Sequence, residues 1–212
     1  LFLLATLLVG PATTVGVEDP GYPDARNIMA ARTPSIVALP VDAAGLAASP
    51  GLDACEYVVL TPSHQCPTNV TMPLARREAL LAWAHARDRV LIEDDYEMEI
   101  GLEGRAQPAL KSLDRSGRVI YVGSLSKTLA PGIRMGYIVA HRDLIREARA
   151  MRRLMLRHPP ANNQRSAALF LAMGYHDALL RRLRQACAER GAAAIAALGR
   201  HLPDVTVSTA PR

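Results

Sequence analysis

The sequence of 212 residues is poor in cysteine and in aromatic residues, and it contains little lysine. Its three cysteines, Cys55, Cys66 and Cys187, are odd in number and fit no metal-binding or redox spacing, which predicts reduced thiols in a cytoplasmic protein. The apolar segment LFLLATLLVG (1–10) has about half the length that spans a bilayer. Since no basic segment precedes it, we expect a buried helix end rather than a signal peptide.

Lysine is scarce: Lys111 and Lys127 are the two lysines among 25 basic residues. The charge is uneven, because residues 1–141 carry 12 basic and 15 acidic side chains (−3), whereas residues 142–212 carry 13 and 5 (+8). A basic half is one mark of a nucleic-acid surface. We favour a solvated helix face, because no DNA-reading motif accompanies the arginines and several recur at helical steps: Arg142, Arg146, Arg149 and Arg153.

Strand and helix patterns alternate along the chain. A chain of this size, half of it apolar, can bury one sizeable core. Alternation of short apolar strands with helices predicts an α/β fold with a mostly parallel sheet. The expected strands are 13–19, 35–40, 56–62, 89–95, 118–124, 136–140 and the start of another at 204–208; the expected helices are 24–31, one beginning at Pro73, 143–157 and 164–200.

Polar clusters follow three of the expected strands: Pro-Ser-His-Gln (62–65), Asp-Asp-Tyr (94–96) and Ser-Leu-Ser-Lys (124–127). In parallel α/β sheets, ligands bind beyond the carboxyl ends of the strands. The three clusters together therefore predict a functional site at this edge of the sheet.

Lys127 directly follows an expected strand, between serines and a threonine. A lysine amine that is partly desolvated becomes a Schiff-base nucleophile, which arginine cannot be. The hydroxyls of Ser124 and Ser126 and the guanidinium of Arg134 form a plausible phosphate cradle, because arginine meets phosphate oxygens in a bidentate fork. The simpler interpretation of each residue alone is an ordinary surface side chain.

Asp94 and Tyr96 close a strand about thirty residues before Lys127. A carboxylate beside a pyridine nitrogen keeps that nitrogen protonated, which makes the ring a better electron sink. A nearby tyrosine can hydrogen-bond a ring hydroxyl. The alternatives are a solvated acidic face and a divalent-metal loop; we expect no metal site, because no EF-hand or histidine-containing spacing is present.

Four ordered motifs carry a family resemblance: EDPGYP (18–23), TPSHQCPTNVTM (61–72), IEDDYEMEI (92–100) and YVGSLSKTLAPGIRMGY (121–137). They resemble the aminotransferase-like domain of the MocR-type, GntR-family transcriptional regulators and the related class I/II aminotransferases. The resemblance implies the three-layer α/β/α large domain of fold-type-I transferases, with pyridoxal 5′-phosphate as cofactor.

By that resemblance, Lys127 is the aldimine lysine and Asp94 the partner of the pyridine nitrogen. Tyr96 contacts the ring hydroxyl and Tyr22 stacks on the ring; Ser124, Ser126 and Arg134 hold part of the phosphate. Cys66 and Asn69 depart from the family, which has an aromatic residue and a glycine there, so the turn geometry of this loop is open and neither His64 nor Gln65 is assigned a role.

A second motif, the S-x-x-K of serine hydrolases, matches the same residues but lacks its partner motifs. Ser124 and Lys127 also match the S-x-x-K of serine β-lactamases, but the S-D-N and K-T-G motifs of those enzymes are absent from the sequence.

The resemblance also implies a chain cut at both ends. Residues 1–203 correspond to the large domain and 204–212 to a stub of a small domain, while the phosphate loop and a DNA-binding winged helix are expected upstream. The wording of the SHQ-x-PT and IEDDYE motifs favours the sensor domain of a regulator that reads out an amine or amino acid. The alternatives are an aminotransferase and a truncated remnant without cofactor. A cytoplasmic homodimer without membrane contact is expected, and DNA only through the winged helix.

Overall fold

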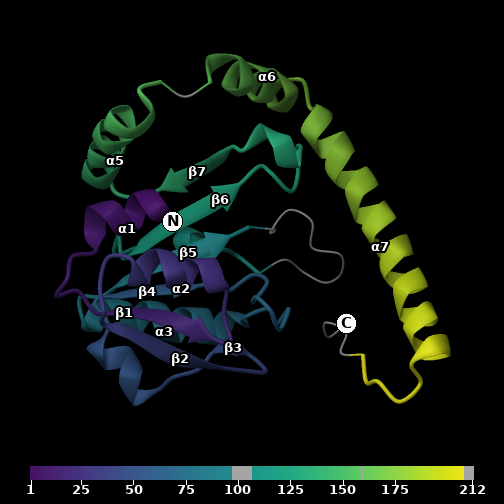
Figure 1. The fold of residues 1–212 in the computed structure, drawn as a ribbon, viewed down its shortest axis with the longest axis horizontal. Helices are drawn as coiled ribbons and strands as arrows, with labels where there is room; N and C mark the ends of the chain where they lie inside the picture. The colour runs from purple at the N-terminus through teal and green to yellow at the C-terminus, as the bar shows by residue number, and fades with distance from the viewer. Residues whose placement is uncertain (97–106, 159, 208–212) are drawn as a thin grey trace. The chain divides into compact units, whose positions relative to one another are not determined.

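The computed structural model describes residues 1–96, 107–158 and 160–207, drawn as a ribbon in Figure 1. The described chain divides into two compact units. The larger contains 1–96, 107–124 and 136–158, and the smaller contains 125–135 and 160–207. None of the described helices combines the length and apolar character that a membrane crossing requires.

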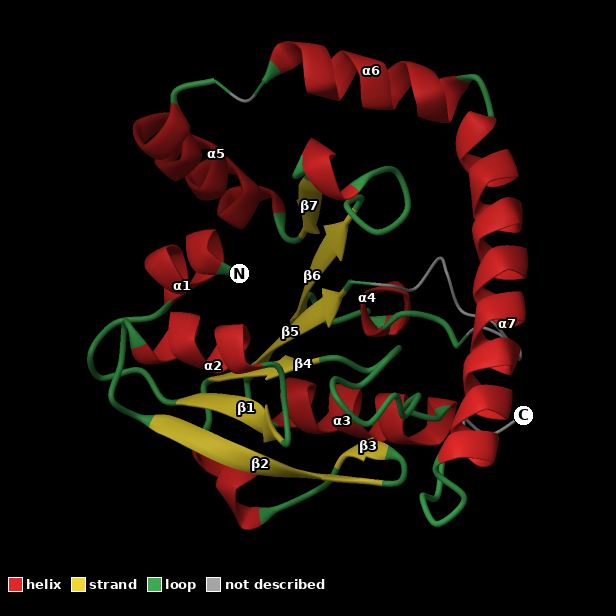
Figure 2. Cartoon of the chain, turned by 45° about the vertical axis from the view of Figure 1, so that its right-hand side comes forward, coloured by secondary structure: helices red, strands yellow, loops and turns green. Residues whose placement is uncertain are grey.

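A seven-stranded sheet runs through the larger unit in the order β3-β2-β1-β4-β5-β6-β7 (Figure 2). The central neighbours pair in parallel, whereas the edge strands β3 and β7 are antiparallel. The predicted mostly parallel sheet is thus confirmed. The strands are β1 (Val15–Asp19), β2 (Ile36–Asp42), β3 (Gly45–Leu46), β4 (Tyr57–Leu60), β5 (Val90–Asp95), β6 (Val119–Ser124) and β7 (Gly136–Val139).

Helices cover both faces of the sheet. Successive strand residues point to opposite sides, so a strand can pack against the helices on each face. Val58 of β4 packs with Leu80 of α3, whereas its neighbour Val59 packs with Leu4 of α1 and Met29 of α2. These two apolar clusters produce the predicted α/β/α layers, and α1 confirms the helix expected within residues 1–10. The helices are α1 (Phe2–Leu8), α2 (Pro23–Ala30), α3 (Leu74–Ala86), α4 (Leu110–Leu113) and α5 (Arg142–Leu156).

The smaller unit contains α6 (Ala161–Ala172) and α7 (Tyr175–His201). The helix expected over 164–200 is therefore confirmed for most of its length, but Met173 and Gly174 divide it in two. Gly174 adopts a φ of 72°, a left-handed conformation that glycine takes without steric cost, and the helix breaks there. The strand expected at 204–208 does not form in its described part, 204–207.

Candidate functional site

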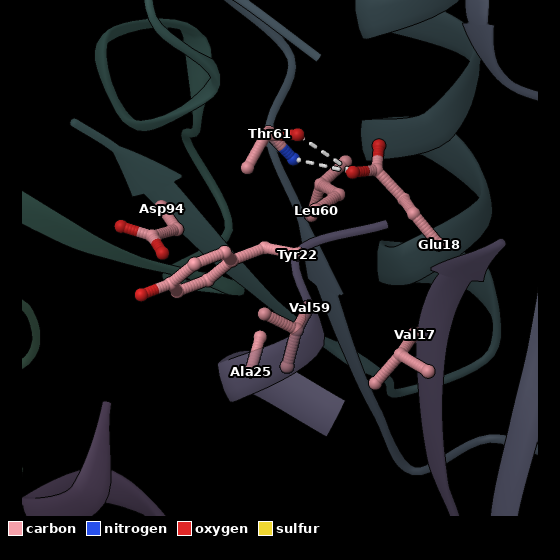
Figure 3. Close-up of a pocket in the computed structure, with 8 residues that line it drawn as sticks. All are labelled: Val17, Glu18, Tyr22, Ala25, Val59, Leu60, Thr61 and Asp94. Carbon is pink, nitrogen blue, oxygen red and sulfur yellow. Dashed lines mark hydrogen bonds between the residues drawn. The ribbon is translucent and has the colours of Figure 1, made fainter. Parts of the chain in front are cut away.

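A pocket lies where β1, β4 and β5 end in the larger unit (Figure 3). These strands are parallel neighbours, so their carboxyl ends meet at one edge of the sheet. The pocket combines an apolar floor with two carboxylates and an aromatic ring. Its lining residues are Val17, Glu18, Tyr22, Ala25, Val59, Leu60, Thr61 and Asp94.

Asp94 belongs to the face of β5 that carries Ile92, and its side chain is half-buried. Burial raises the pKa of Asp94 to about 6; the positive charge of the N-terminal amine opposes the rise, and the charge of Asp95 adds to it. Figure 3 shows the carboxylate beside the ring of Tyr22. Because burial makes the ionised form costly, this carboxylate gains most from a cationic partner inside the pocket.

Tyr22 reaches the pocket from the start of α2, where it is the residue before Pro23, the first residue of the helix. Its phenol donates a hydrogen bond to Oδ2 of Asp24 at 3.0 Å, and the residue lines the pocket while remaining exposed. Tyr96 follows the last residue of β5 and is half-buried. The final four residues of the IEDDYEMEI motif, 97–100, lie outside the described residues.

Glu18 is a buried carboxylate of the pocket that the sequence did not single out. Its Oε2 accepts hydrogen bonds from the backbone N–H of Thr61 (3.1 Å), from the Thr61 hydroxyl (2.6 Å) and from Nε2 of Gln65 (3.3 Å). Burial raises the pKa of Glu18, and these bonds oppose the rise. The carboxylate thereby ties the end of β1 to the loop after β4.

Gln65 organises that loop, although no role was predicted for it. The side chain is 1% exposed, and its Nε2 donates to the carbonyls of Pro20 and Cys66, each at 2.8 Å. Its Oε1 accepts from the backbone N–H (3.0 Å) and the hydroxyl (2.6 Å) of Thr68. Asn69 takes a φ of 62°, a left-handed conformation that asparagine tolerates better than most residues, so the turn survives without glycine.

Lys127 lies in segment 125–135 of the smaller unit, three residues after β6 ends. Its side chain is exposed, and a hydrogen bond from the backbone N–H of Leu125 to the carbonyl of Met135 (2.9 Å) closes the segment. Arg134 is also exposed and has a left-handed φ of 47°. A non-glycine residue in this conformation is uncommon and is found more often at functional sites.

The predicted site residues therefore belong to different units. Tyr22 and Asp94 line the pocket of the larger unit. Tyr96 and Ser124 belong to the same unit but are not among the residues that line the pocket. Ser126, Lys127 and Arg134 share one segment of the smaller unit.

Comparison with known sequences identifies one family and several related transcriptional regulators. The family model described as "Aminotransferase class I and II" matches residues 1–199. The HTH-type transcriptional regulator TauR of Rhodobacter capsulatus is 46% identical over 88% of this chain and 38% of its own length. The probable rhizopine catabolism regulatory protein MocR of Rhizobium meliloti is 35% identical over 96% of this chain and 42% of its own length. The chain thus spans about two fifths of these relatives.

Solved aminotransferases share the fold. LysN of Thermus thermophilus, an alpha-aminoadipate aminotransferase complexed with N-(5′-phosphopyridoxyl)-L-leucine, matches with a TM-score of 0.88 and 28% identity over 99% of this chain and 56% of its own. The kynurenine aminotransferase of Pyrococcus horikoshii, in complex with PMP, matches with a TM-score of 0.87 and 28% identity over 93% of this chain and 51% of its own. These matches confirm the predicted fold class.

Proposed function

The chain belongs to the aminotransferase class I and II family, and we propose that it is the cofactor-binding part of the ligand-sensing domain of a MocR-type transcriptional regulator. The observation that carries the proposal is the pocket, where the half-buried carboxylate of Asp94 faces the ring of Tyr22 at the carboxyl edge of the sheet. The 46% identity with a transcriptional regulator favours this function over that of a free-standing enzyme.

The pocket fits the pyridine ring of pyridoxal 5′-phosphate. A protonated ring nitrogen is a cation, and it would offset the desolvation that raises the pKa of Asp94. The ring of Tyr22 supplies a flat apolar surface on which a second aromatic ring can stack. The donor set therefore matches a heteroaromatic cation better than a metal ion or a purely apolar ligand.

In this proposal the remaining residues have separate tasks. Lys127 would provide the amine that holds the cofactor, and its Nζ would hold or move a proton. Ser124, Ser126 and Arg134 bind phosphate oxygens, and Tyr96 donates to the ring hydroxyl. When bound, the cofactor supplies an electrophilic carbon and an electron sink for amine substrates. Asp94 would pair with the ring nitrogen and keep it protonated, and the ring of Tyr22 would stack on the cofactor ring.

The domain boundaries, the oligomeric state and the contact with DNA follow from the same proposed function. We propose that residues 1–203 form the large domain and 204–212 a stub of the small one, in a cytoplasmic homodimer that responds to an amine or amino acid. DNA would then be contacted only through a winged-helix domain outside this chain. The regulator names of TauR and MocR support that arrangement.

An aminotransferase is the second candidate. The 2-aminoadipate transaminase of Thermus thermophilus is 30% identical and covers the whole of this chain and 55% of its own length. The two functions differ in turnover when the cofactor-loaded chain receives an amino acid and a 2-oxo acid. New oxo acid in many-fold excess over protein would establish the enzyme, whereas at most one equivalent would support the sensor.

To test cofactor binding, the purified chain is incubated with pyridoxal phosphate and its absorbance spectrum is recorded. The sample is then reduced with borohydride, and the labelled peptide is identified by mapping. We expect a visible absorbance band and a pyridoxyl label on Lys127. Lys111 is the built-in control, since its Nζ is engaged by Asp114 at 3.2 Å and by the carbonyl of Val119 at 2.7 Å. A folded chain with no band, or with the label on Lys111, would contradict the proposal and favour the non-functional remnant.

A further inference from the structure

Three acidic residues in a row end β5, and strand alternation sends the middle one away from its neighbours. Asp94 lies on the pocket face, whereas Glu93 and Asp95 lie on the opposite face with Leu91, which packs against the α3 side of the sheet. There they meet Arg77 of α3. Glu93 and Arg77 are 0% exposed and Asp95 is 4% exposed. Removing three ionisable groups from water is costly unless they compensate one another.

Arg77 is bound on three sides by backbone carbonyls. Its Nε donates to Met72 (2.9 Å), Nη2 to Pro62 (2.7 Å) and Nη1 to Pro108 (3.2 Å). Met72 and Pro62 are the two ends of the loop that carries Gln65, and Pro108 leads into α4. One planar guanidinium, whose fork is pre-organised, thus joins three chain segments around the end of β5.

The two carboxylates are bound as firmly. Glu93 accepts hydrogen bonds from the backbone N–H groups of Leu110 (2.8 Å) and Lys111 (2.9 Å), and its Oε1 lies 3.9 Å from Nη1 of Arg77. Asp95 accepts from the hydroxyls of Tyr121 (3.1 Å) and Ser63 (3.4 Å). Both residues that flank Asp94 are therefore fixed to neighbouring segments.

We propose that Arg77, together with Glu93 and Asp95, positions the carboxylate of Asp94 toward the cofactor ring. The inference rests on the proposed function and deepens it. Asp94 is covalently continuous with two anchored residues, so its backbone has little freedom to move relative to the pocket. None of the three positioning residues lines the pocket, and they act on the cofactor only through Asp94.

The experiment compares Arg77→Gln and Glu93→Gln with Arg76→Gln in the same chain. Arg76 is the matched control, because it precedes Arg77 in α3 and its Nη1 pairs with Asp42 at the surface, at 2.5 Å. Each variant is examined by circular dichroism, urea unfolding, pyridoxal phosphate titration, and the pH at which the visible absorbance is lost.

We expect Arg77→Gln and Glu93→Gln to weaken cofactor binding by about tenfold or more, since small displacements of positioned groups have large effects. The visible absorbance should persist to higher pH, because a ring without its nitrogen proton withdraws fewer electrons from the Lys127 nitrogen. Arg76→Gln should leave both properties unchanged.

The outcomes separate the two proposals. If the wild-type chain binds the cofactor and the folded Glu93→Gln variant binds it with the same affinity and pH behaviour, the positioning role is refuted while the proposed function stands. Lower stability alone would identify a purely structural cluster. If Arg77→Gln does not fold, Glu93→Gln decides. A folded wild type that shows no visible band refutes both proposals.

Discussion

Replacing Asp94 by Asn should stabilise the chain without cofactor and abolish cofactor retention. The pKa of Asp94 rises from 3.8 to about 6 on folding, chiefly through burial. A difference of about two pH units, at about 1.4 kcal/mol each, corresponds to about 3 kcal/mol of destabilisation when the group is ionised. Because the side chain is only half-buried, solvent screening reduces the expected gain to about 1–2 kcal/mol.

The sign of the effect depends on pH. Between 3.8 and about 6 the folded state binds the proton more tightly than the unfolded state, so stability falls as pH rises through this window. Above about 6 the penalty is complete, and below 3.8 it disappears. The advantage of Asp94→Asn should therefore be largest at neutral pH and vanish in acid.

Urea unfolding of both proteins without cofactor, at about pH 8 and about pH 4, measures this difference. Asp19→Asn is the control, because Asp19 is an exposed acid at the end of β1. An Asp94→Asn variant that is no more stable than wild type at neutral pH, or whose gain is equal at both pH values, would refute the reasoning.

Three further predictions concern the lysine, the turn before α2 and the loop after β4. Lys127→Ala should abolish the visible band and the borohydride label while changing the free energy of unfolding by less than about 0.5 kcal/mol, because the side chain is exposed. Gly21→Ala would place a Cβ 2.1 Å from the carbonyl oxygen of Glu18. Urea unfolding should therefore show a free energy of unfolding lower by about 1–3 kcal/mol, and cofactor titration a weaker affinity. Gly132→Ala is the control and should change neither, because the space around Gly132 is open. Gln65→Ala should cost about 1–3 kcal/mol in the same unfolding assay, because Glu18 and the Pro20 carbonyl lose a buried donor.

The sheet was predictable because its strands are short, continuous apolar runs. A strand buried on both faces needs apolar residues at every position, and β4 (YVVL) meets that requirement in the sequence itself. Asp94 and Tyr22 were identified from motifs at strand ends, and the structure brings both into one pocket. The break at Gly174 was missed because one glycine within a long helical pattern is often tolerated.

The contacts that support the site were not predictable in the same way. Glu18 and Gln65 are 47 positions apart, and Arg77 and Pro108 are 31 apart. No local pattern marks such pairs, because each partner alone resembles an ordinary surface residue until the fold buries it. Arg77 in particular has the sequence environment of Arg76, one position earlier, which remains partly exposed.

Strand alternation and the buried Arg77 together explain how the end of β5 can hold three acidic residues. If Glu93, Asp94 and Asp95 shared a face, their mutual repulsion would raise the pKa of each and leave the pocket with protonated acids. Alternation instead puts Glu93 and Asp95 on the side where the cation Arg77 and several donors are available. Of these three acids, Asp94 alone lines the pocket, whose described lining holds no Lys or Arg side chain, and the nearby positive charge is that of the N-terminal amine. That arrangement keeps one carboxylate available for a ligand cation.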